Sequence, residues 1–160
     1  MNESVAFAEK YLSKKGALVD ANVLLVYLFG QTAPLLLERS HRTQQYAKDY
    51  PVVRKVVEEC RVIHTTPNVL TEVSNLGKDG GEPFYAGLAK AANVMSEHYC
   101  DSRSACAEST FKKLGLTDAG LCLLARSHIV VTFDLPLYQM LRSRGIDAIN
   151  VAHLIEASWK

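Results

Sequence analysis

Four short apolar or β-branched segments interrupt the chain, at residues 17–19, 61–64, 129–133 and 148–151. Longer segments in which apolar residues recur at helical spacing separate them. Strands that alternate with helices form a parallel sheet, because each helix carries the chain back to the same end of the sheet. The alternation therefore predicts an α/β fold, a three-layer α/β/α sandwich around a central, mostly parallel sheet of four to five strands.

The chain fits a single domain over residues 1–160. Its hydrophobic content of 48% is enough for one buried core. An additional helix is expected at 1–15, and an extended helical segment at 31–60. The glycines and the proline of segment 77–83 predict an exposed loop, and Thr66 and Thr117 are expected to begin helices.

Several protein classes are disfavoured by what the sequence lacks. It has no run of about 18 apolar residues and no secretory signal at its start, which predicts a cytoplasmic protein without a membrane partner. Its four cysteines show no Cys-x-x-Cys spacing and are expected to be small buried hydrophobic residues. A zinc site from His98, Cys100 and Cys106 would lack a fourth ligand at motif spacing and is disfavoured.

Four acidic residues occupy positions that helix and strand formation alone explain incompletely. Asp20 and Asp134 each follow an apolar strand segment, where an isolated Asp is usually a helix cap. Asp118 lies at the start of a helix, where the helix dipole favours a carboxylate, and Glu72 borders an apolar helical stripe. Separately, each acid has an ordinary structural explanation, and for Glu72 it is a solvated helix face.

Taken together, the four acids predict a metal site. Carboxylates that meet at one edge of a sheet repel each other unless a cation neutralises them, and their oxygen atoms suit Mg²⁺ or Mn²⁺. One or two such ions can activate water and stabilise the leaving oxygen of a phosphodiester. The predicted reaction class is therefore phosphodiester hydrolysis.

Four motifs contain these acids: LVDANVLL (18–25), TTPNVLTEVSNL (65–76), GLTDA (115–119) and TFD (132–134). In this order they resemble the PIN-domain nucleases, over about residues 16–153. The resemblance implies a metal-dependent endoribonuclease that cleaves single-stranded RNA. It makes Asp20, Glu72, Asp118 and Asp134 the catalytic, metal-binding residues, and Asn22, Thr132 and Thr117 residues that orient ligands or substrate.

The resemblance also suggests partners. Many small PIN proteins are VapC-like toxins of toxin–antitoxin pairs, commonly homodimers that an antitoxin protein inhibits. The long segment 31–60 and the extra N-terminal helix depart from that compact pattern and favour a different PIN subgroup. Phe133 and Pro136 stand beside Asp134 where further acids can occur, so a second metal would bind weakly.

Arg39 and Arg42 lie in a mixed-charge segment with Tyr46 and are candidates for RNA binding, although such a segment is more often only a solvated helix face. The formal net charge of +1 by itself disfavours a nucleic-acid partner. Once the four acids are assigned to a metal site, 18 basic residues face 13 acidic ones, an excess of +5. Two alternatives remain: a weakly active or inactive PIN-fold scaffold that binds RNA, and phosphoryl transfer through Asp20, which Asn22 disfavours.

Overall fold

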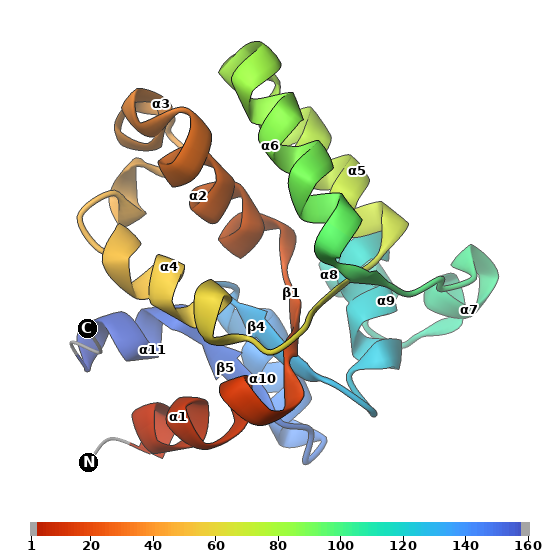
Figure 1. The fold of residues 1–160 in the computed structure, drawn as a ribbon. Coiled ribbons are helices and arrows are strands. Elements are labelled where there is room, and N and C mark those ends of the chain that lie inside the picture. Colours follow the sequence, from red (N-terminus) through yellow and green to blue (C-terminus); the bar gives the residue numbers. More distant parts are fainter. Residues whose placement is uncertain (1–2, 158–160) are drawn as a thin grey trace.

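A computed structural model describes residues 3–157, which form an α/β fold around one five-stranded sheet (Figure 1). The strands are β1 (Ala17–Val19), β2 (Ile63–Thr65), β3 (Ser96–Glu97), β4 (Ile129–Thr132) and β5 (Ala148–Asn150). They run in the spatial order β3-β2-β1-β4-β5, and every neighbouring pair is parallel. Helices flank the sheet, which confirms the predicted α/β/α sandwich.

The helices connect the strands as crossovers. The helical elements are α1 (Glu3–Lys15), α2 (Ala21–Thr32), α3 (Pro34–Arg39), η1 (Gln44–Tyr46), α4 (Tyr50–Glu59), α5 (Pro67–Leu76), η2 (Lys78–Gly80), α6 (Gly81–Val94), α7 (Ser102–Ala107), α8 (Phe111–Leu114), α9 (Leu116–Leu124), α10 (Leu135–Ser143) and α11 (Val151–Glu156). Helix α2 packs against α4, α5 and α6, and α10 packs against β4 and β5. The α5–α6 pair projects away from the sheet in Figure 1.

The centre of the sheet is the most deeply buried part of the core. All three residues of β1 and all four of β4 are buried, and α2 contributes a nearly continuous apolar surface. Parallel strands covered on both faces need such unbroken apolar sequences. As a result, the residues that follow β1 and β4 are held rigidly at the carboxyl edge of the sheet.

Three local predictions were wrong. Segment 77–83 is largely exposed, as predicted, but it is not a loop, because it contains η2 and the start of α6. Helix α9 begins at Leu116 after Gly115, so Thr117 lies inside the first turn and does not cap the helix. Of the four cysteines only Cys122 is buried, while Cys106 is exposed and the other two are half-buried.

Within residues 3–157, no helix is long and apolar enough to cross a membrane.

Candidate functional site

Asp20 is a buried carboxylate at the carboxyl end of β1. Only 4% of the residue is exposed, because α2 begins directly after it and β4 lies beside it. Its Oδ1 accepts a hydrogen bond from the Ala21 N–H at 2.6 Å, and its Oδ2 accepts one from the Thr132 hydroxyl at 2.6 Å. Burial raises the pKa of Asp20 to about 6, against the lowering effect of these two bonds.

Thr132 connects Asp20 to Asp134. While its hydroxyl donates to Asp20, its Oγ1 accepts the Asp134 backbone N–H at 2.9 Å. Asp134 in turn caps α10, with Oδ1 accepting the Leu137 N–H at 2.7 Å. Asp20 and Asp134 therefore both cap helices, which is the usual role of an isolated Asp after a strand. The hydrogen bonds described above also hold both carboxylates at one edge of the sheet.

Asp118 and Glu72 reach this edge from two helices. Asp118 lies in the first turn of α9, and Glu72 lies in the middle of α5 and is half-buried. Burial, followed by the charges of Asp20, Asp134 and Glu72, raises the pKa of Asp118 to about 8. Glu72 and Asp134 also raise the pKa of Asp20. We refer to these four residues, which the sequence predicted as ligands, as the acid cluster.

The acid cluster has the chemistry of a site for a hard divalent cation. The charges that act on Asp118 are all negative, so full ionisation of the cluster is unfavourable without a cation. Carboxylate oxygens are the preferred ligands of Mg²⁺ and Mn²⁺, and an oxygen that accepts one hydrogen bond keeps a lone pair for a metal. These residues therefore have the chemistry to hold such an ion, which would replace the protons that Asp118 and Asp20 otherwise retain. No three of the four carboxylates bring oxygens within 4.8 Å of one another, so the side chains would have to move closer together to bind it.

Two open hollows each include one member of the acid cluster. One, of about 370 Å³, includes Asp134 and is also lined by Asn22, Arg42, Gln45, Tyr46, Phe133 and Leu135. The other, of about 270 Å³, includes Glu72 and is also lined by Asn68, Thr71, Asn75, Leu76, Leu116 and Thr117. We refer to them as the Asp134 hollow and the Glu72 hollow. Both hollows include polar side chains that could form hydrogen bonds with a substrate.

The other predicted site residues separate into two groups. Asn22 and Arg42 line the Asp134 hollow, and Thr117 lines the Glu72 hollow, despite not capping α9. Arg39, at the end of α3, is exposed and is not among the described residues that line either hollow. The structure therefore brings Arg42 to the candidate site without Arg39.

Sequence reasoning missed two features of the hollows. Phe133 stacks on Tyr46, with ring centroids 3.8 Å apart and planes inclined by 15°, although 87 residues separate them in the chain. No local pattern marks such a pair. Asn75, in contrast, could have been found, because Asn68, Glu72 and Asn75 recur at i, i+4 and i+7 on one helical face.

We expect Thr132→Val to weaken the site without dismantling the fold. The variant keeps the shape of the side chain, but it removes both the hydrogen bond to Asp20 and the one from the Asp134 N–H. Loss of a group that orients a metal ligand typically costs about 10- to 100-fold in affinity or activity. A Mn²⁺ titration should show a loss in this range, whereas the control Ser143→Ala, altered at an exposed position of α10 outside both hollows, should bind like the wild type.

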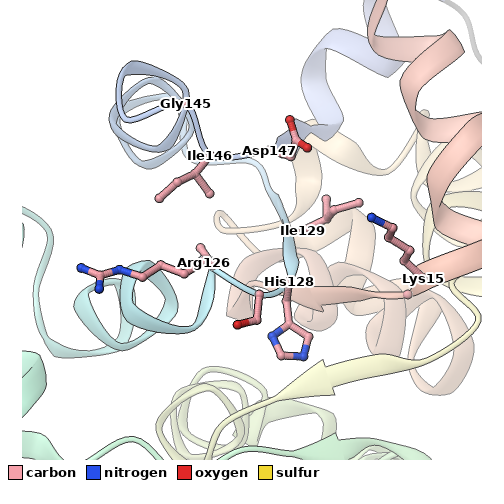
Figure 2. A pocket seen from close by; sticks show the side chains of 10 residues that line it. Lys15, Arg126, His128, Ile129, Gly145, Ile146 and Asp147 are labelled. Atoms are coloured by element: carbon pink, nitrogen blue, oxygen red, sulfur yellow. The ribbon is translucent and has the colours of Figure 1, made fainter.

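A different pocket lies at the opposite, amino end of the strands (Figure 2). Its volume is about 240 Å³, and its lining includes Lys15, Arg126, His128 and Asp147. Lys15 ends α1, whereas His128 and Asp147 directly precede β4 and β5. The acids of the cluster are not among its lining residues, so this pocket is separate from the candidate site.

Comparison with known proteins found no relative: no family model, no curated protein and no solved structure matches the chain. The chain's function is therefore inferred from the geometry of the acid cluster and from the four sequence motifs that contain it.

Proposed function

We propose that this protein is a metal-dependent endoribonuclease that hydrolyses phosphodiester bonds of single-stranded RNA. The observation that carries the proposal is the position of Thr132, whose hydrogen bonds hold Asp20 and Asp134 together at one edge of the sheet. The pKa of Asp118, raised by its burial and by the charges of the three other acids, supports it. A group of like charges of which one is buried and three are half-buried is unfavourable for folding without a compensating cation, and such arrangements occur typically where function requires them. A divalent metal held there would supply an activated water and stabilise the charge on the leaving oxygen.

The acid cluster and Thr132 have different tasks in this proposal. Asp20, Asp118, Asp134 and Glu72 would hold Mg²⁺ or Mn²⁺ through their carboxylate oxygens. Thr132 positions Asp20 and Asp134 relative to one another through its two hydrogen bonds. Because Asp20 is buried and anchored at both oxygens, little reorganisation of this ligand is needed during the reaction.

The Asp134 hollow supports a single-stranded nucleic acid as the substrate. Arg42 can bind a phosphate, and Asn22 can donate to the backbone or to a base. Tyr46 beside them is half-buried, and the buried Phe133 covers one face of its ring, so an unpaired base would stack on the part of the ring that stays exposed. A base held in a duplex cannot use such a surface, which favours single-stranded RNA.

Arg42→Ala should weaken RNA binding more than Arg39→Ala does. Both arginines are exposed, but of the two only Arg42 lines the Asp134 hollow. Loss of one phosphate contact should raise KM roughly 3- to 10-fold and reduce the salt dependence of binding by about 0.7 in its logarithmic slope. Cleavage kinetics at several salt concentrations test this, and equal effects of the two substitutions would contradict the assignment of Arg42.

The direct test of the proposal is incubation of the purified protein with single-stranded RNA and Mn²⁺. We expect cleavage by the wild type, and a loss of at least about 100-fold in Asp20→Asn, as is typical when a directly acting group is removed. Asp79→Asn, altered at an exposed aspartate of η2, is the matched control and should cleave like the wild type. Equal cleavage by the wild type and Asp20→Asn would refute the proposal.

A further inference from the structure

Three histidines from distant parts of the sequence form a second cluster, on a different part of the sheet from the acids. His64 lies in β2, His98 directly follows β3, and His128 directly precedes β4. One ring nitrogen from each lies within 4.8 Å of the corresponding nitrogens of the other two. In Figure 2 the imidazole of His128 points toward the yellow-green strand β2, which carries His64. We refer to these residues as the histidine cluster.

The three rings form a nearly regular triangle. Their centroids are 4.9 Å apart for His64 and His98, 4.3 Å for His64 and His128, and 4.7 Å for His98 and His128. The interplanar angles lie between 53° and 61°, so the rings are tilted toward one another and do not stack in parallel. All three residues are half-buried, which leaves the cluster accessible to an ion from solvent.

The hydrogen bonds around the cluster present unprotonated nitrogens to its centre. His128 Nδ1 lies 3.3 Å from the Leu124 carbonyl oxygen, which can only accept, so Nδ1 carries the proton and Nε2 keeps its lone pair. A backbone carbonyl in this role is the usual partner of a metal-binding histidine. His64 Nδ1 and His98 Nε2 lie 2.8 Å apart, so one donates to the other and at least one ring nitrogen here is unprotonated.

We propose that His64, His98 and His128 form a Zn²⁺ site, with three imidazole ligands and a fourth position open to water or a small anion. Zinc binds imidazole nitrogen at about 2.0–2.1 Å, which sets tetrahedral ligand nitrogens about 3.3 Å apart. His64 Nδ1 and His98 Nε2 would need to separate by only about 0.5 Å from their contact of 2.8 Å. The shared proton moves to the outer nitrogen of the same ring, so both rings stay neutral and the proton count is unchanged.

The identity of the ion follows from the ligands. Imidazole suits Zn²⁺ and its transition-metal neighbours, whereas Mg²⁺ prefers the carboxylate oxygens of the acid cluster. Desolvation and the other two rings lower the pKa of His64, which keeps it in the neutral, metal-binding form. Bound zinc would connect β2, the end of β3 and the start of β4, and would thereby fasten the two-residue edge strand β3 to the sheet.

The test is Zn²⁺ binding to the full chain, measured in competition with a chromogenic chelator. We expect one Zn²⁺ at this site in the wild type, and affinities at least about 100-fold lower in His98→Gln and in His128→Gln. His41→Gln, altered at an exposed histidine outside the cluster, and Asp118→Asn, altered in the acid cluster, should leave this affinity unchanged. Zn²⁺ should also raise the melting temperature of the wild type and not that of His98→Gln.

A measurement on the wild type alone covers the case in which a histidine variant does not fold. Co²⁺ substituted for Zn²⁺ should give the intense visible absorption of four-coordinate, nitrogen-bound cobalt, and Zn²⁺ should abolish that absorption by displacement. The proposal is overturned if the wild type gives no such spectrum and binds no Zn²⁺, or if His98→Gln and His41→Gln bind equally. It is also overturned if only Asp118→Asn loses the ion, because the metal then lies in the acid cluster.

Discussion

Asp118→Asn should stabilise the metal-free protein at pH 8 and, at the same time, abolish its RNA cleavage. The folded-state pKa of Asp118 is raised to about 8 from the ordinary aspartate value of 3.8. The folded state therefore holds a proton that the unfolded state has released, and the associated stability is fully present below about pH 4 and is lost as the pH rises toward 8. An amide has no such charge, so the variant avoids this loss.

The stabilisation should amount to about 2 kcal/mol at pH 8, after allowance for solvent screening of this partly exposed side chain. It should nearly vanish at pH 4. Denaturant unfolding in the presence of EDTA at both pH values measures it, with Asp79→Asn as a control that should match the wild type at both. A variant that is less stable than the wild type at pH 8, or one that still cleaves RNA at the wild-type rate, would contradict this account of Asp118.

The affinity of the acid cluster for Mn²⁺ should rise steeply with pH. Between about pH 6 and pH 8, binding must displace close to one proton, because the pKa of Asp118 is about 8 and that of Asp20 about 6. One displaced proton corresponds to a tenfold gain in affinity for each pH unit. The gain should level off above pH 8, where the wild type is already ionised.

Calorimetry in two buffers of different ionisation enthalpy counts the released protons directly. At pH 7 we expect close to one proton for each site filled, and at pH 9 close to none. In Asp118→Asn any residual binding should release far less than one proton at pH 7. An affinity that does not change between pH 6 and pH 8 would show that the carboxylates are already ionised in the metal-free protein.

The sequence predicted those parts of the fold in which burial dictates residue type. Strands β1 and β4 are buried along their whole length and were visible as apolar runs. Strand β3 was not assigned to any residues, because it is a two-residue edge strand of Ser96 and Glu97 whose position depends on pairing with β2. Edge strands lack the apolar pattern that reveals a central strand.

The candidate site could be anticipated where topology alone brings residues together. The carboxyl ends of parallel strands meet at one edge, so Asp20 and Asp134 could be placed near each other from the sequence. Capping and a role in the acid cluster proved compatible for both residues, because a carboxylate has two oxygens and each can accept more than one bond. The pKa of Asp118 could not be anticipated, since it depends on burial and on charges from three other elements.

Contacts between distant loops were beyond sequence reasoning. The Tyr46–Phe133 stack depends on how segment 31–60 returns to the end of β4. The histidine cluster joins residues 64, 98 and 128, whose spacing matches no local metal motif. The zinc alternative considered from sequence contained His98, but it paired that residue with nearby cysteines instead of with distant histidines.

The most direct test of the central claim, that the four carboxylates form one divalent-metal site, is a Mn²⁺ titration at pH 8 followed by electron paramagnetic resonance. The account predicts saturable binding by the wild type and by Asp79→Asn, and an affinity at least about 100-fold lower in Asp20→Asn. His98→Gln should bind Mn²⁺ normally, because this ion prefers oxygen ligands. The claim is contradicted if the signal of free Mn²⁺ grows in proportion to the Mn²⁺ added, with the wild type and with Asp20→Asn alike.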